Sequence, residues 1–271
     1  MKMVRFIFSV CFFLMAFEGQ SQTKSDIFSK DINRAGTSFG NELSAFFRLK
    51  QPGYAYFGAP LLFCLATPFD ESVRDYSKSW HGPVQDKMAS VGYIYGRPET
   101  SLIFSSVLYT QGLTTGNDVN RKIGSHIFQS FFYSAAVVGI GKVVFGRKRP
   151  YNNDGPYDFW NSSFTNDDVM SHPSGHSAFS FGLSTTLAHY SNTPMKIVWY
   201  GLAVNTVLSR IYQDDHWLSD VLVGSFIGTA FSLMVFNQSD NVFQPGETIT
   251  GGQLSVSLTS SGGWNISVFP K

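Results

Sequence analysis

The stretch SRIYQDDHWLSD at residues 209–220 is a polar turn between two apolar runs without charge, residues 197–209 and 221–239. Apolar runs of this kind are typical of helices that are buried or face lipid. Four similar runs precede them, at residues 51–69, 101–117, 123–141 and 177–195, and the last two of these contain His126 and His189. The sequence therefore predicts an all-α fold, a bundle of about six core helices over residues 50–237.

The composition is apolar. Hydrophobic residues make up 43% of the 271 residues and charged residues only 14%, against about 25% charged residues in average soluble domains. A net charge of +1 gives no reason to expect nucleic acid as a partner. Most of the apolar runs are near the lower length limit for a membrane span, but they are rich in Ser, Thr, Asn and Gly, and the mean hydropathy is −0.02. A soluble bundle fits about as well as a membrane-embedded one, and we favour membrane association.

The N-terminus has the pattern of a secretory signal. Lys2 and Arg5 precede an apolar run at residues 6–17, and the small residues of GQS follow at 19–21. We expect a signal peptide at residues 1–21 that is cleaved before Gln22, and hence secretion across the inner membrane to the periplasm or the cell-envelope membrane. The alternative is an uncleaved anchor, which we disfavour because the run is short for a span.

The two remaining segments differ from the bundle. Residues 22–49 are polar, with an amphipathic helix expected near residues 41–49. In the tail, residues 238–271, apolar and polar side chains alternate at 253–258 and 264–269. This alternation predicts a small C-terminal β-hairpin appendage, for which a stabilising role is expected.

The first candidate cluster is KVVFGRKRP at residues 142–150. Lys142 and Arg149 are seven residues apart, so on a helix they would lie two turns apart on one face. Pro150 would then force the chain out of the helix just after Arg149. A lone basic cluster at a helix end is more often structural, because it suits the helix dipole or flanks a membrane helix. For Arg147 and Lys148 we expect a surface role.

The second cluster is PSGH at residues 173–176. Ser174 is a good helix cap for the apolar run that follows. Free backbone N–H groups at a helix start form an anion site, and Gly175 allows close approach of the backbone. His176 would then lie in the first turn, beside the anion. A capping serine followed by a surface histidine is the alternative without function.

The third cluster lies in the opening stretch. His216 and Asp220 are four residues apart at a helix start, so their side chains are expected to meet. A carboxylate on one imidazole nitrogen leaves the other nitrogen nucleophilic. A lone His/Asp pair would more often be structural. The carboxylates of Asp214 and Asp215 could disfavour highly charged substrates or point to solvent.

The loop at residues 151–172 is long enough to be functional. Its aromatic residues Tyr157, Phe159 and Trp160 could give lipid a path to the pocket or cover it, and ordinary packing is at least as good an expectation. Taken together, the three clusters supply three cations, a helix start and two histidines. Positioned cations stabilise the charge that spreads over the oxygens of a transferred phosphoryl group, so the set fits phosphoryl chemistry.

The order and spacing of these clusters resemble the type 2 phosphatidic acid phosphatase family: Lys-x6-Arg-Pro, then Pro-Ser-Gly-His, then Ser-Arg-x5-His with an Asp four residues later. The resemblance covers roughly residues 50–237 and implies a helical bundle and a phosphatase that needs no metal or cofactor. It implies His216 as nucleophile, Asp220 as the residue that orients it and His176 as proton donor. It implies phosphate binding by Lys142, Arg149, Ser174, Gly175 and Arg210.

Several functions remain open. The leading one is hydrolysis of phosphate monoesters or pyrophosphates through a phosphohistidine, and low charge with many aromatics favours a lipid phosphate as substrate. A vanadium haloperoxidase has the same anion site, but the chain is short for that group. A non-catalytic phosphate-binding protein of the envelope is the third possibility, which the complete motifs disfavour.

Overall fold

The computed structural model describes residues 22–47, 53–242, 253–258 and 264–269, and this part of the chain is mostly helical. The chain divides into two units, residues 1–48 with helix α2 (Gln22–Phe47) and residues 49–271 with the other elements. In chain order these elements are α3 (Gly53–Ala66), η1 (Thr67–Phe69), α4 (Asp70–Lys78), α5 (Pro83–Tyr95), α6 (Pro98–Thr115), α7 (Asp118–Phe145), η2 (Pro150–Asn152), η3 (Asp167–Val169), α8 (Gly175–His189), α9 (Thr193–Tyr212), α10 (Leu218–Val242), β1 (Gln253–Leu258) and β2 (Trp264–Phe269).

Each of the six predicted apolar runs lies mainly in one helix, in order α3, α6, α7, α8, α9 and α10. The boundary between the fourth and fifth runs was placed too late, because α8 ends at His189. The side chain of Asn192 accepts a hydrogen bond from the backbone nitrogen of Met195 at 3.1 Å and so caps the start of α9. Helices α4 and α5 were not predicted, and α2 begins earlier than the helix expected near residues 41–49.

Two of the predictions concern the ends of the chain. β1 and β2 pair antiparallel, with Gln253 opposite Phe269 and Leu258 opposite Trp264. Neither their side chains nor their placement on the bundle is described, so the appendage stays a prediction. The predicted signal peptide at residues 1–21 lies outside the described residues.

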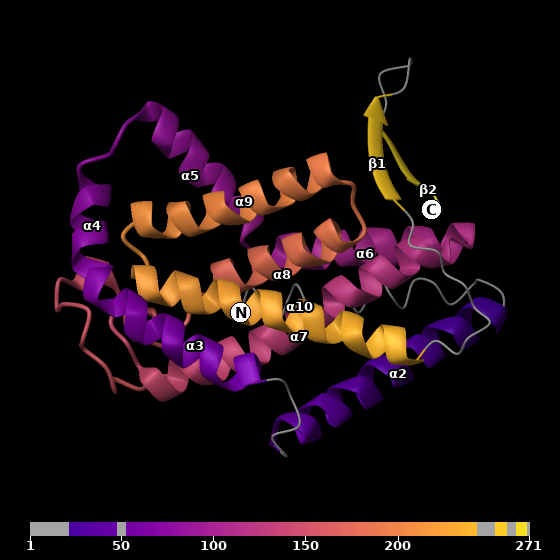
Figure 1. Cartoon of the computed structure of the whole chain (residues 1–271), viewed down its shortest axis with the longest axis horizontal. Helices are drawn as coiled ribbons and strands as arrows, with labels where there is room; N and C mark the ends of the chain where they lie inside the picture. Colours follow the sequence, from indigo (N-terminus) through magenta and orange to yellow (C-terminus); the bar gives the residue numbers. More distant parts are fainter. Residues whose placement is uncertain (1–21, 48–52, 243–252, 259–263, 270–271) are drawn as a thin grey trace. The chain divides into compact units, whose positions relative to one another are not determined.

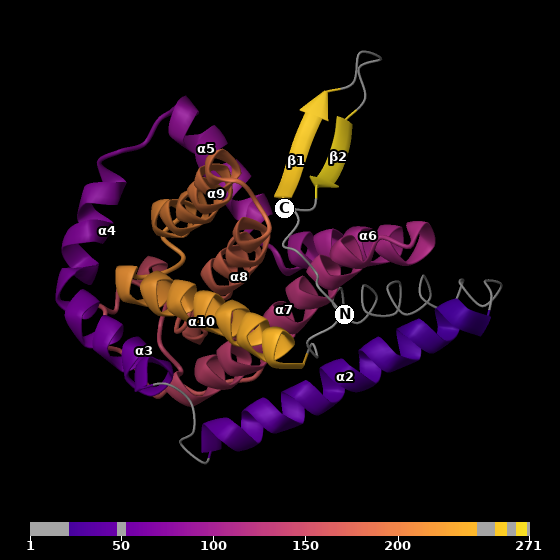
Figure 2. The ribbon, with the colours of Figure 1, turned by 45° about the vertical axis from the view of Figure 1, so that its right-hand side comes forward.

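Helix α8 lies in the middle of the bundle and packs against α7, α9 and α10 (Figures 1 and 2). Buried apolar side chains join these helices, and each contributes about 1.5–3 kcal/mol when fully removed from water. The largest cluster of them contains Tyr95, Leu108, Ile123, Ile127, Leu183, Leu187, Tyr190 and Phe236. The core thus extends along α8, with α8 as its centre.

Glycines bring α10 very close to α8. A Cβ on Gly228 would lie 2.0 Å from the carbonyl oxygen of Ala178, and a Cβ on Gly224 would lie 2.3 Å from that of Ser174. Small residues four apart on a helix allow such close backbone approach. The contact at Ser174 fixes the start of α8 against the first turns of α10, where the third motif ends.

All three motif segments lie at one end of the bundle. The end of α7, the start of α8 and the turn between α9 and α10 meet there, and α4 crosses that same end between α3 and α5 (Figure 1). The topology therefore brings together residues that are up to 78 positions apart in the motifs, from Lys142 to Asp220.

Two segments are long and apolar enough to cross a membrane, residues 118–152 and 218–236, with mean hydropathies of 1.5 and 1.7. In the most apolar part of the second segment, 67% of the residues are buried inside the bundle. The core helix of a soluble protein would show similar burial. In the first segment this share is only 28%. One face of α7, with Phe128, Phe132, Ile140 and Val144, is exposed on the surface of the bundle.

Candidate active site

The first motif segment spans the end of α7 and the turn after it. α7 ends at Phe145 because Gly146 adopts a φ of +48°, in the left-handed region that favours glycine. A Cβ on Gly146 would also lie 2.6 Å from the backbone nitrogen of Asn161. Arg149 therefore has an extended backbone outside the helix. The prediction that Lys142 and Arg149 share a helical face was wrong, because the helix ends before the proline at position 150 can act on it.

The three cations predicted to bind phosphate contact oxygens of the chain itself. Arg149 donates from Nε to the carbonyl oxygen of Asp167 at 2.9 Å and from Nη2 to Asp167 Oδ1 at 2.8 Å. Arg210 pairs through Nη2 with Asp215 Oδ2, and Asp215 Oδ1 lies 3.6 Å from Arg149 Nη1. Lys142 donates to the backbone carbonyl of residue 170. An anion that binds Arg149 and Arg210 must therefore compete with carboxylates already there.

The second motif begins α8, as predicted. Ser174 is the N-cap, and its Oγ accepts a hydrogen bond from the backbone nitrogen of Ser177 at 3.5 Å. Its own backbone nitrogen donates to the carbonyl oxygen of Asp220 at 3.1 Å. Gly175 is the buried first residue of the helix. This geometry presents the free N–H groups of a helix start to an anion.

Two buried nitrogens at the site have no hydrogen-bond partner among the described residues: His176 Nε2 and Arg210 Nε. Both side chains contact the ring of Tyr93, which stacks on His176 with centroids 5.2 Å apart and lies 5.3 Å from the Arg210 guanidinium carbon. Lys142 and Arg149 lie close enough to His176 to act on its charge. Unpaired buried polar groups are costly, so the two nitrogens favour a ligand with acceptor oxygens.

The third motif places His216 in the turn before α10 and Asp220 in the first turn of that helix. Nδ1 of His216 lies 3.7 Å from Asp220 Oδ2, which is too long for a hydrogen bond. Ser171 bridges the two, because its Oγ donates to Asp220 Oδ2 at 2.5 Å and lies 3.5 Å from His216 Nδ1. The predicted pair therefore meets, but less directly than side chains four apart within one helix would. The arrangement leaves Nε2 of His216 for chemistry.

The His216 imidazole is 3% exposed. Burial holds the pKa of His216 well below its usual 6.5, and the cations of Arg149 and Lys142 act in the same direction, while Asp220 opposes them. The ring is therefore neutral at neutral pH. A neutral imidazole has the lone pair that a nucleophile needs.

Arg147 is fully buried, which overturns the surface role expected for it. Its guanidinium lies 2.7 Å from Asp70 Oδ2 and 2.6 Å from Asp220 Oδ1, so two carboxylates from distant helices draw it inside. Burial raises the pKa of the Asp70 carboxyl above its ordinary value, against the lowering influence of Arg147 and of the Ser219 backbone N–H. Lys148, by contrast, lies near the surface and pairs with Asp154 and Asp158, as expected.

The two aspartates before His216 have specific partners. Asp214 accepts two hydrogen bonds from Arg74, from Nε at 2.6 Å and from Nη2 at 2.7 Å. Asp215 pairs with Arg210, as described above. Neither carboxylate merely points to solvent, and only that of Asp215 faces the predicted phosphate-binding cations.

The loop aromatics divide into two kinds. Phe159 packs inward, with its ring 5.9 Å from that of Phe63 and 5.0 Å from the Arg147 guanidinium carbon. Tyr157 and Trp160 are exposed, at 69% and 74%. Of the three, only Phe159 fits ordinary packing.

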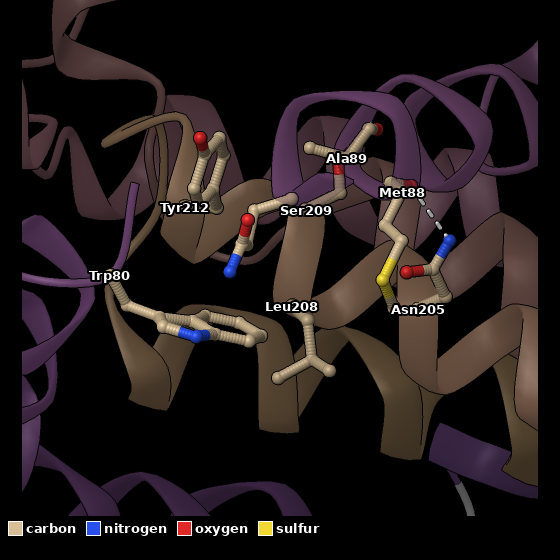
Figure 3. Close-up of a pocket in the computed structure, with 8 residues that line it drawn as sticks. Trp80, Met88, Ala89, Asn205, Leu208, Ser209 and Tyr212 are labelled. Atoms are coloured by element: carbon tan, nitrogen blue, oxygen red, sulfur yellow. Dashed lines mark hydrogen bonds between the residues drawn. The ribbon is translucent and has the colours of Figure 1, made fainter. Parts of the chain in front are cut away.

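A separate pocket lies between α5 and α9 (Figure 3). Trp80, Met88 and Leu208 give it an apolar lining, and Asn205 donates to the carbonyl oxygen of Met88 at 2.8 Å. None of the predicted site residues lines it. It is therefore not the place where the predicted chemistry would occur.

Sequence reasoning missed the residues that surround the motifs. Tyr93 and Asp70 come from α5 and α4, which carry no motif, and no local signal marks them. Ser171 and His172 directly precede the second motif, and a polar pair beside a motif could have been noticed. His172 Nδ1 lies 3.0 Å from Asp220 Oδ1.

Part of this chain is similar to known phosphatases. A stretch of 115 residues is 35% identical to the lipid A 1-phosphatase of Porphyromonas gingivalis and covers 40% of this chain and 22% of that protein. A stretch of 114 residues is 31% identical to an undecaprenyl-diphosphatase of Sulfolobus acidocaldarius and covers 42% of this chain and 54% of that protein. The chain thus spans less than two thirds of the length of either relative.

The fold is similar to the crystal structure of a transmembrane PAP2 type phosphatidylglycerolphosphate phosphatase from Bacillus subtilis. The TM-score is 0.55 at 18% identity, and the similarity covers 71% of this chain and 99% of that chain. The sequence model of the PAP2 superfamily matches residues 125–244, which include every predicted site residue. This part of the chain, less than half of its length, is thus similar to the PAP2 superfamily.

Proposed function

We propose that the protein is a phosphatase that hydrolyses lipid phosphate monoesters or pyrophosphates, without a metal, through a phosphohistidine on His216. The observation that carries the proposal is the pair of buried, unpartnered nitrogens, His176 Nε2 and Arg210 Nε. They lie at the bundle end where Ser174 starts a helix and where His216 is held neutral. A phosphate oxygen would supply the missing acceptor, and the neutral imidazole would supply the nucleophile.

In the first step, Nε2 of His216 attacks phosphorus and the bond between phosphorus and the leaving oxygen breaks. Burial and the nearby cations lower the pKa of His176 to about 3, and the negative charge of a bound phosphate opposes them, so that the ring takes up a proton with the substrate. The protonated His176 gives this proton to the leaving oxygen, so the leaving group departs as a neutral alcohol or a protonated phosphate. Lys142, Arg149 and Arg210 stabilise the negative charge that spreads over the other phosphate oxygens. The Ser174 hydroxyl and the backbone N–H of Gly175, at the start of α8, bind the same oxygens.

In the second step, water attacks the phosphorus of the phosphohistidine. His176, deprotonated by the first step, takes a proton from this water as the phosphorus–nitrogen bond breaks. Inorganic phosphate leaves, and His216 returns to its neutral form. Asp220 supports the imidazole throughout, because its carboxylate stabilises the positive charge that the ring carries while it is phosphorylated.

A lipid substrate and a membrane location fit the surface of the bundle. Large apolar side chains on four helices are 45–72% exposed, more than a solitary bundle in water usually presents. They include Phe57, Leu61 and Leu65 of α3, Ile103 and Val107 of α6, Phe128, Phe132, Ile140 and Val144 of α7, and Ile197, Val198, Val204 and Leu208 of α9. We propose that these faces contact lipid tails and that the site opens at the end of the bundle, near the headgroups, in the cell envelope.

The test is phosphate release by detergent-purified protein in the presence of EDTA. The substrates are p-nitrophenyl phosphate, phosphatidate, undecaprenyl diphosphate, lipid A 1-phosphate and phosphatidylglycerol phosphate. The variant is His216→Ala, and the matched control is His126→Phe, which replaces another buried histidine. We expect wild type and control to turn over a lipid phosphate, and His216→Ala to lose at least about 10³-fold in kcat.

Turnover that survives in His216→Ala, or that EDTA abolishes, would reject the mechanism. Labelled substrate should leave an acid-labile phosphoryl group on wild type that His216→Ala lacks. Bromide oxidation with added vanadate, in place of phosphate release, would favour the haloperoxidase. Phosphate binding without turnover by either activity would favour the binding protein.

A further inference from the structure

Arg147 is the most completely engaged side chain near the site. Its five N–H groups have five oxygen contacts: Nε and Nη2 to the carbonyl oxygen of Pro156 at 3.0 and 2.6 Å, Nη1 to Ser219 Oγ at 2.7 Å and Asp220 Oδ1 at 2.6 Å, and Nη2 to Asp70 Oδ2 at 2.7 Å. A guanidinium has five donors in a fixed plane, so its orientation has no freedom left. Rings of Phe63, Phe159 and Trp217 lie 5.0–5.6 Å from its central carbon.

Asp70 completes the same arrangement from α4. Its Oδ1 accepts from the backbone nitrogen of Ser219 at 2.8 Å, and its Oδ2 accepts from Ser219 Oγ at 2.7 Å as well as from Arg147. Ser219 directly precedes Asp220, so Asp70 holds the backbone of the first turn of α10 at that point. Asp70, Arg147 and Asp220 are each no more than 1% exposed.

The Asp220 carboxylate is in turn fixed on every side. Oδ1 contacts Arg147 and His172, and Oδ2 accepts from Ser171 Oγ at 2.5 Å and from the backbone nitrogen of Trp217 at 3.0 Å. The same Oδ2 lies 3.7 Å from His216 Nδ1. The groups that hold the Asp220 carboxylate in place therefore also determine its position relative to the His216 imidazole.

We propose that Arg147 and Asp70 are positioning residues for His216, which act by holding the Asp220 carboxylate charged and aimed at the imidazole. The role rests on the phosphohistidine function proposed above. Arg147 separates two buried carboxylates that would otherwise repel each other, and without it one of them would take up a proton. A protonated Asp220 could not stabilise the positive charge of the phosphorylated ring. Asp70 lies outside residues 125–244, the stretch that matches the superfamily model. The proposal therefore adds α4 to the elements that support catalysis.

The experiment compares Arg147→Met, Arg147→Lys and Asp70→Asn with Lys148→Met, a control that removes the neighbouring, partly exposed cation. We expect kcat to fall about 100-fold in Arg147→Met and about 10-fold in Asp70→Asn. This is the range found when the hydrogen-bond partner of a metal-binding side chain is removed, which is a comparable supporting role. KM should stay within about threefold, because neither residue contacts the cations that would bind phosphate. Arg147→Lys should recover part of the loss, and Lys148→Met should match wild type.

A double-mutant cycle separates positioning from general destabilisation. In an Asp220→Asn background, Arg147→Met and Asp70→Asn should lower kcat by less than about twofold, because the group through which they act is already gone. Full, multiplicative losses in that background would overturn the proposal. Wild-type kcat in both Asp70→Asn and Arg147→Lys would overturn it as well.

A readout independent of turnover keeps the two proposals distinguishable. Nitrogen-15 NMR of labelled histidine should show His216 in wild type as the Nδ1-protonated tautomer, and Asp70→Asn should lose this preference while remaining folded by its thermal transition. An unchanged tautomer in Asp70→Asn and Arg147→Lys would reject the positioning role. Inactivity of wild type with an intact tautomer effect would reject the phosphatase function alone.

Discussion

Helix α7 contributes to two buried histidine environments, one near each of its ends. His126, near the start, is 4% exposed, and its Nδ1 lies 3.0 Å from the hydroxyl oxygen of Tyr190, with the ring of Phe236 5.6 Å away. At the other end, Lys142 lies near His216, which is 3% exposed. Burial is thus nearly equal in the two environments.

The neighbours of the two histidines differ in charge. His126 contacts a hydroxyl group and aromatic rings and has no carboxylate among its described contacts, although Lys122 acts on its charge. His216 has a carboxylate on one side and is acted on by the cations of Lys142 and Arg149. A hydroxyl satisfies a buried imidazole, whereas a carboxylate and cations also prepare it for a change of charge. Burial alone therefore does not distinguish a catalytic histidine from a structural one.

The largest expected effect comes from replacing the polar neighbour of each histidine, Asp220 beside His216 and Tyr190 beside His126. Asp220→Asn keeps the shape but removes the charge, and we expect kcat to fall about 10³- to 10⁴-fold, as in the loss of an orienting aspartate elsewhere. Tyr190→Phe should leave kcat within twofold (about 0.4 kcal/mol). Steady-state phosphate release on both variants checks this, and equal effects would mean that the two environments do not differ in function.

The second prediction concerns the cation at the C-terminal end of α9. Arg210→Met should lower kcat/KM about 10²- to 10³-fold, because a preorganised donor to the developing charge is lost. Lys196→Met, at the exposed start of the same helix, is the control and should match wild type. A higher KM with unchanged kcat would instead show that Arg210 binds the substrate and the transition state equally well.

The third prediction tests whether the Asp215 carboxylate competes with phosphate for Arg149 and Arg210. Asp215→Asn should lower KM, and the inhibition constant of inorganic phosphate, by about fivefold, which corresponds to about 1 kcal/mol for a partly exposed pair. Asp214→Asn serves as the matched control, because that carboxylate binds Arg74 instead. A higher KM in Asp215→Asn would show that the carboxylate orients the arginines for substrate.

The smallest effect is on stability. The unfolded chain takes up a proton on the residue 216 imidazole near pH 6.5, whereas the folded chain, with its lowered His216 pKa, does not. This contribution to stability is therefore complete above pH 6.5 and is lost as pH falls below it, by at most about 1.4 kcal/mol per pH unit. Denaturant unfolding between pH 7.5 and 5.0 should show a steeper loss in wild type than in His216→Asn. Parallel curves would mean that the folded imidazole takes up the proton as readily as the unfolded one.

Local patterns predicted much of the fold. The six apolar runs correspond to six helices because length and the absence of charge are properties of the segment itself. The cap at Ser174 was found for the same reason, since a capping side chain acts on a backbone nitrogen three residues away. The end of α7 was misjudged because Gly146 was not considered as a stop signal ahead of Pro150. Helices α4 and α5 were missed because charged residues interrupt their apolar faces.

The amino-acid sequence by itself determined the motif residues, their order and their resemblance to a phosphatase family, because these depend on residue identity and spacing. Only the tertiary structure decided that Arg147 is buried, that Asp70 reaches it across 77 positions of sequence, and that Asp215 occupies the predicted phosphate-binding arginines. The physical reason is the distance along the chain over which each interaction acts. Propensity and capping act over a few residues, whereas a charged side chain can be buried only if the fold delivers an opposite charge to it from elsewhere in the chain.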